Sequence, residues 1–168
     1  MEAQKLVGAT GCLISCTLAA GSTTTVGSTG TFYYAIKGKG YTAAAWSTTG
    51  TPTTDAATGA AFKGVLKGFG SVFVYGLDHS GAIKCAQGSI VPLDTSTSTY
   101  AWSNSAAPQF PELPDDFCPV GYLTILAGST ADATTGWIQG TSNQASVTGI
   151  TYARHDVALG MPDRPQTS

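Results

Sequence analysis

The side chains of this sequence that could carry out chemistry are few and scattered. Asp115 and Asp116, with Glu112 nearby, form its one cluster of carboxylates. Two carboxylates in a cleft can act as a general acid and a general base when their pKa values are separated. These residues lie in a proline-rich stretch, where neighbouring side chains more often point apart. We therefore expect a solvated turn at this position and not a catalytic site.

Neither histidine belongs to a catalytic pattern. His79 lies within the turn sequence 78–81, where a polar ring faces water. His155 and Asp156 are neighbours in a predicted strand, so their side chains point to opposite faces of a sheet. A general base and the carboxylate that orients it must face each other. The sequence therefore predicts no histidine-based catalysis.

The cysteines show no spacing that is typical of a metal site. There is no C-x-x-C pair and no histidine close to a cysteine, whereas zinc sites use tightly spaced ligand pairs. We expect buried free thiols, although one or two disulfides stay open as alternatives. The four residues are Cys12, Cys16, Cys85 and Cys118. No cofactor, no metal and no enzymatic activity are expected.

The composition excludes several classes of protein. Only 11% of the 168 residues are charged and the net charge is −2, so the dense cationic face that nucleic-acid binding requires is absent. Half of the chain is Gly, Ala, Ser or Thr, which is not typical of long helices. A hydrophobic fraction of 42% argues against disorder. No stretch approaches the roughly 20 apolar residues of a membrane span.

Two β-hairpins are the clearest predicted elements. Phe32, Tyr34 and Ile36 alternate with less apolar residues, as in a half-buried strand. This strand is expected to turn over 38–40 and to return over 41–46. The second hairpin is expected to join strands over 71–77 and 82–85 through a turn at 78–81.

The remaining pattern predicts an all-β protein. Further strands are expected over 13–18, 89–93, 120–127, 145–152 and 153–159. Residues 21–30 and 47–54 are interpreted as connectors or, equally, as exposed Thr-rich strands. No long helix is predicted, with at most one or two helical turns over 55–67. The fold class predicted is an antiparallel β-sandwich or jelly-roll-like barrel with long loops and little helix.

We expect a single β-rich domain over 1–168 with three special segments. Residues 1–17 are a candidate N-terminal arm and residues 163–168 a candidate C-terminal tail. Residues 107–120 contain four prolines and are expected to cross between two halves of the domain as a stiff extended segment outside any sheet.

Aromatic residues are the candidates for contact with a partner. Trp46 and Trp102 lie among small polar residues, so we expect both to be partly exposed. Together with Phe110 and Met161 they are the predicted interface residues. Exposed tryptophan and tyrosine are typical of subunit interfaces and also stack on sugar rings.

Several segments, taken in order, resemble small virion structural proteins of tailed bacteriophages, of the kind that decorate or cement the head. The resemblance extends over about Leu18 to Pro162. The Leu-Pro-Asp and Cys-Pro-Val-Gly sequences within 113–125 contribute most to it. The other segments are 32–44, 72–74, 78–81, 156–157 and 160–162.

The resemblance implies a function without catalytic residues. It implies a protein made in the host cytoplasm and carried in the virion, bound to the major capsid protein or another virion protein. It also implies a homo-oligomer, a trimer or a dimer. No partnership with nucleic acid or a membrane is expected. The alternative from the residues themselves is a glycan-binding module or a fibre-associated virion protein that uses exposed aromatics such as Trp102.

Overall fold

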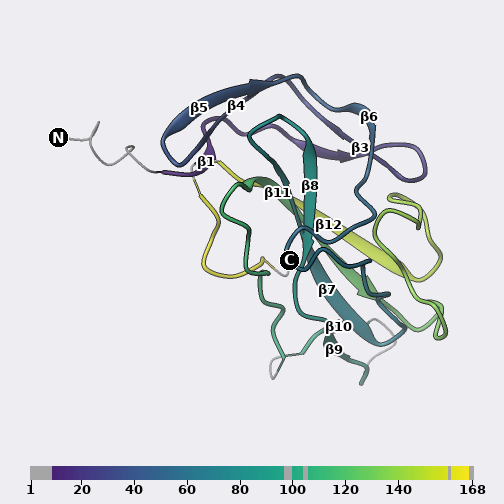
Figure 1. Cartoon of the computed structure of the whole chain (residues 1–168). Coiled ribbons are helices and arrows are strands. Elements are labelled where there is room, and N and C mark those ends of the chain that lie inside the picture. The colour runs from purple at the N-terminus through teal and green to yellow at the C-terminus, as the bar shows by residue number, and fades with distance from the viewer. Residues whose placement is uncertain (1–8, 97–99, 104–105, 159, 167–168) are drawn as a thin grey trace.

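The computed structural model describes residues 9–96, 100–103, 106–158 and 160–166. Over these residues it contains twelve strands and no helix. The strands form three antiparallel sheets, and one of these curls into a half-barrel (Figure 1). The all-β, antiparallel fold class predicted from the sequence is therefore confirmed.

The largest sheet is built around two long apolar strands. β7 (Phe69–Leu77) and β11 (Cys118–Ala127) pair antiparallel, and nearly all of their residues are buried, because both faces of this sheet are covered. The other strands add to this pair at its two sides: β12 (Ile150–Asp156) on β11, β8 (Ile83–Gln87) and β9 (Val91–Asp94) on β7, and β10 (Ala101–Trp102) on β9.

The predicted second hairpin is confirmed as β7 and β8. The predicted strands over 145–152 and 153–159 are wrong in their bounds, because residues 150–156 form the single strand β12. Residues 145–149 form a loop and turn before it, and Val157 donates its backbone N–H to Val120 just past its end. Leu159 lies outside the described residues.

The first predicted hairpin is also present, with a tighter turn than expected. β4 (Phe32–Ile36) pairs with β5 (Lys39–Ala43) through the two residues Lys37 and Gly38. Both turn residues have positive φ, 50° and 79°, as a type I′ turn requires. The return strand therefore starts at residue 39 and ends at residue 43, not at residue 46. β1 (Gly11–Cys12) pairs with the other side of β4.

The third sheet comes from segments with little apolar character. β2 (Leu18–Ala20), β3 (Thr25–Ser28) and β6 (Ser47–Gly50) lie side by side. The interpretation of the Thr-rich segments as strands is therefore correct for parts of 21–30 and 47–54. The predicted strand over 13–18 is wrong, since the chain bends after β1 and only its last residue is in a strand.

Two groups of buried side chains lie on the two faces of the largest sheet. The main core contains Phe73 and Leu123 of that sheet together with Phe32 and Tyr34 of β4. The second cluster lies around Val72, Val74 and Tyr122. Side chains alternate between the faces of a strand, so neighbouring residues of β7 and β11 belong to different clusters.

The proline-rich segment packs on the second cluster. Its side chains Phe110, Leu113 and Phe117 cover that face of the sheet in an extended path, as predicted. The prediction that the whole of 107–120 stays outside a sheet is wrong, because β11 begins at Cys118. Pro119 is accommodated there by an irregular register between Pro119 and Gly121, where a missing amide donor is tolerated.

The described residues of the two predicted arms include positions that are buried in the folded body. In the N-terminal arm, residues 1–8 lie outside the described residues, and Cys12 and Cys16 are fully buried. In the C-terminal tail, Pro165 is buried and the backbone N–H of Gln166 donates to the Tyr122 hydroxyl at 3.0 Å. Gln166 thus contacts Tyr122 of the second cluster, and residues 167–168 are outside the described part of the chain.

Candidate protein-binding surface

Of the four predicted interface residues, Trp46 is placed inside the core. Its side chain is 5% exposed and its ring lies 4.7 Å from that of Phe32. Its backbone N–H also donates to Ser28 Oγ of β3. The expectation that Trp46 is partly exposed is therefore wrong, because a long-range aromatic contact covers a residue whose local sequence is polar.

Trp102 is half-buried, as predicted. It lies in β10, and a Cβ atom built on Gly70 would come within 2.6 Å of its ring. The six-membered ring of the indole thus lies against the glycine of β7. Its Nε1 is buried and has no hydrogen-bond partner among the described residues. Trp102 therefore contributes to packing at this end of the sheet and leaves a limited surface for a ligand.

Phe110 and Met161 are also half-buried, and both pack on the second cluster. The Phe110 ring meets Tyr122 edge-on at 5.0 Å. The two residues come from the proline-rich segment and the C-terminal segment, which the structure brings together over one face of the sheet. Trp46 and Trp102 lie elsewhere, so the four predicted residues do not form a common surface.

The charged residues singled out in the sequence make only exposed pairs. Lys37 Nζ lies 2.9 Å from Asp115 Oδ2, and His79 Nδ1 lies 3.9 Å from Asp116 Oδ2. All four side chains are more than half exposed. Exposed pairs of this kind contribute about 0–1 kcal/mol. The expected solvated turn at Asp115 and Asp116 is confirmed.

His155 and Asp156 are directed to different neighbours, as predicted. The His155 ring stacks on Tyr122 at 4.7 Å, whereas Asp156 Oδ1 accepts a hydrogen bond from the Leu18 backbone N–H at 2.8 Å. Burial lowers the pKa of His155, and the nearby Asp156 and Gln166 only partly oppose this shift. The neutral imidazole is therefore favoured, but no carboxylate is positioned to orient it as a base.

The four cysteines are buried, unpaired thiols, which agrees with the expectation from the sequence. Burial raises the pKa of each thiol, that of Cys118 to about 12. A protonated buried thiol is a poor nucleophile. Within the described residues, no group of three or more His, Cys, Asp or Glu side chains could hold a metal ion.

The deepest polar cluster connects a loop to the core. Tyr75 Oη lies 2.9 Å from Gln139 Oε1 and 3.2 Å from Gln144 Oε1, and Gln144 Nε2 donates to Gln139 Oε1. Arg154 donates to the backbone carbonyl of Gln144. Tyr75, Gln139 and Gln144 are fully buried, so a ligand cannot reach their side chains. Their hydrogen bonds hold the loop 138–144 against β7.

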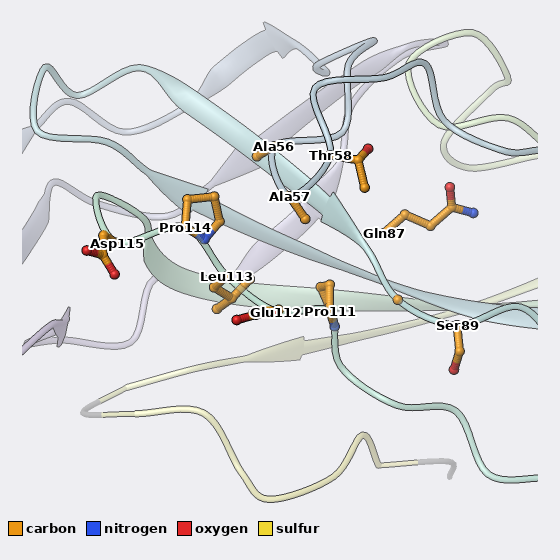
Figure 2. Close-up of a pocket in the computed structure, with 11 residues that line it drawn as sticks. Ala56, Ala57, Thr58, Gln87, Ser89, Pro111, Glu112, Leu113, Pro114 and Asp115 are labelled. Atoms are coloured by element: carbon orange, nitrogen blue, oxygen red, sulfur yellow. The ribbon is translucent and has the colours of Figure 1, made fainter.

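A groove of about 600 Å³ runs between the proline-rich segment and the loop at Ala56–Thr58 (Figure 2). The end of β8 and residues 88–89 form its floor. Glu112 and Asp115 are the charged residues in its lining, which contains no aromatic side chain. The groove therefore offers no aromatic face for a sugar ring. The Thr58 hydroxyl in its lining donates to Asp55 Oδ2 at 2.8 Å, within the turn that starts at Asp55.

Three of the four large apolar residues that are exposed among the described residues lie on a different part of the surface. Leu13, Ile14 and Tyr33 are 44%, 42% and 48% exposed, and the Leu13 backbone N–H donates to the Tyr33 carbonyl across β1 and β4 at 2.8 Å. Beside them lies a shallow hollow of about 330 Å³, which Gly40 and Thr42 also line. We call Leu13, Ile14 and Tyr33 the apolar patch.

The apolar patch was missed from the sequence. Tyr33 alternates with the buried residues of β4, which marked it as outward-facing, but Leu13 and Ile14 belong to an apolar run that was interpreted as strand. Contiguous exposed apolar side chains are typical of protein-binding surfaces. Tyr33 lies on a regularly paired strand and its carbonyl accepts from the Leu13 backbone N–H, so the backbone at these two residues of the patch is held in place before any partner binds.

No helix in the described part of the chain is long and apolar enough to cross a membrane. The comparisons with family models, with curated proteins and with solved structures find no match to this chain.

Proposed function

We propose that this protein is a non-catalytic structural protein that binds a protein shell through the apolar patch. In its specific form, the proposal is that the chain decorates or cements the outer surface of a viral capsid. The observation that carries it is the exposure of Leu13, Ile14 and Tyr33, of which Tyr33 lies on the paired strand β4 and the other two lie in the bend that follows β1. Burying such side chains against a partner is the main source of binding free energy in protein interfaces.

The rest of the surface supports the same reading. Net charge is −2 and the exposed strands are rich in Thr, Ser, Gly and Ala, so little charge has to be desolvated when a partner covers them. A patch of three residues gives a modest contact by itself. A shell presents the same site many times, so an oligomer that carries two or more copies of the patch would bind it with higher avidity than a single chain.

The viral part of the proposal depends on the sequence resemblance to phage head proteins. The partner proposed is the major capsid protein or another virion protein, and the location proposed is the assembled virion. Among the predicted interface residues, those that pack on the second cluster are not needed for this contact. The proposed contact residues are those of the apolar patch.

The alternative of glycan binding makes a different prediction. Trp102 is the aromatic that it would use, yet its six-membered ring lies against Gly70 and the groove lining has no aromatic residue. A glycan site at Trp102 would change tryptophan fluorescence on titration with sugars, and Trp102→Ala would abolish that change.

The test of the proposed function is the composition of assembled particles. Quantitative mass spectrometry of purified virions is expected to find this chain at a fixed ratio to the major capsid protein. Its absence from purified particles would refute the virion assignment. A sugar-dependent fluorescence change that requires Trp102, together with that absence, would favour the glycan-binding alternative.

A further inference from the structure

The outer edge of β5 is free among the described residues. The Tyr33 backbone faces β1, so alternation directs the backbones of Tyr34 and Ile36 toward β5. Their partners on β5 are Tyr41 and Lys39, which form hydrogen bonds within the hairpin. Gly40 and Thr42 alternate with these residues, so their N–H and C=O groups point away from β4. Both residues are exposed, and Figure 1 shows β5 at the rim of the molecule.

The other edges are covered, short or interrupted. On β8, the Cys85 carbonyl accepts from Ala56 and the Gln87 N–H donates to Asp55. β6 contains a register shift, with Thr48 at a φ of 89°. β1, β2 and β10 have two or three residues.

Charged side chains lie at the outer edge of β12 and hydrogen-bond to neighbouring segments. Asp156 accepts from the Leu18 backbone of β2, and Arg154 donates to the Gln144 carbonyl. Charged side chains on an edge strand discourage pairing with another chain. β5 is less protected: its five residues show a regular register and contain no proline, and its one charged residue, Lys39, is at one end of the strand.

We propose that two copies of this chain pair antiparallel through the β5 edge. The β1–β4–β5 sheets of the two copies would then form one continuous six-stranded sheet. In the symmetric register, Gly40 of each copy faces Thr42 of the other, and Tyr41 lies at the two-fold axis. Each Gly40–Thr42 pair exchanges two N–H···O=C bonds, which gives four bonds in the dimer.

The charges on β5 favour a second copy as the occupant of this edge. In the symmetric register Lys39 lies opposite Ala43, so no like charges face each other. The two Lys39 side chains start about 14 Å apart along the strands, which exceeds the Debye length of about 8 Å at physiological ionic strength. Lys39 Nζ already lies over the Tyr41 ring at 5.3 Å, next to the proposed axis.

The pairing goes beyond the binding of the apolar patch to a shell, and it is tested without one. Gly40→Pro removes a backbone donor that points outward, so the hairpin keeps its internal hydrogen bonds. A Cβ at Gly40 meets nothing within 4 Å, and its φ is not positive. The same holds for Gly50 at the end of β6, so Gly50→Pro is the matched control.

Light scattering across a concentration series measures the outcome. The wild-type chain and Gly50→Pro are expected to approach about 34 kDa, twice the 17.1 kDa of one chain. Gly40→Pro removes two of the four bonds and is expected to weaken dimerisation about 30-fold. Thr42→Pro, which also removes an outward donor, serves if Gly40→Pro does not fold by circular dichroism.

Two results would overturn the pairing. One is a wild-type chain that stays at the monomer mass up to high micromolar concentration. The other is a dimer whose dissociation constant is unchanged by the substitutions in β5. Either result leaves the shell-binding proposal intact, because that proposal is tested on particles. Conversely, a dimer in solution together with absence from virions would refute only the proposed function.

Discussion

The hydroxyl of Tyr75 provides a sensitive test of how the loop 138–144 is held to the core. Tyr75→Phe keeps the ring and removes the oxygen that lies 2.9 Å from Gln139 Oε1 and 3.2 Å from Gln144 Oε1. Gln139 Oε1 still accepts from Gln144 Nε2, but Gln144 Oε1 loses its described side-chain partner while fully buried. Leaving one buried polar group unsatisfied costs about 1–3 kcal/mol.

For a chain of this length, about 2 kcal/mol lowers the melting temperature by about 4–8 °C. Urea unfolding monitored by circular dichroism is expected to show the same loss in the free energy of unfolding with an unchanged m-value. Tyr33→Phe is the matched control, because the Tyr33 side chain is 48% exposed, and its stability is expected to stay within about 0.5 kcal/mol of wild type. Wild-type stability in Tyr75→Phe would refute the role assigned to this cluster.

Two further predictions concern packing and pH. Gly70→Ala places a Cβ 2.6 Å from the Trp102 ring and 2.9 Å from the Ile125 carbonyl, so we expect the free energy of unfolding to fall by about 1–3 kcal/mol and the tryptophan emission to shift to the red. Gly50→Ala is the control and is expected to change neither quantity. An unshifted emission spectrum in Gly70→Ala would contradict the Trp102 contact. Burial lowers the pKa of His155, so the unfolded chain takes up a proton at this residue before the folded chain does as the pH falls. The free energy of unfolding is therefore expected to decrease as the pH drops below about 6.5, and to decrease less steeply in His155→Gln. Equal pH dependence of the free energy of unfolding in the two proteins would contradict the pKa shift.

The hairpins could be predicted from the sequence because their signals are local. Alternation at Phe32, Tyr34 and Ile36 fixes one face of β4, and a nearby glycine permits the turn. The bounds were less accurate, since the turn uses Lys37 at positive φ, a residue type that rarely adopts it. Thr-rich segments gave no clear answer because threonine suits both loops and exposed strands.

The surface could not be predicted because it depends on contacts between distant segments. Trp46 is buried by Phe32 in spite of its polar neighbours in the chain. Leu13 and Ile14 look like core residues, but β1 ends at Cys12, after which the chain turns its apolar side chains outward. Whether an apolar side chain is covered is decided by elements that local patterns do not specify.

The structure thus places an exposed apolar patch at Tyr33 of β4 and at the bend after β1, and the central claim is that this patch binds a protein shell. The most direct measurement is co-sedimentation of the purified chain with capsids assembled without it. Tyr33→Asp is expected to raise the dissociation constant at least about tenfold, which corresponds to about 1.4 kcal/mol of binding free energy per site. Phe69→Asp changes another exposed aromatic, which is 38% exposed and lies on β7, and is expected to bind like wild type. Unchanged binding of Tyr33→Asp, or loss of binding in Phe69→Asp alone, would contradict the account.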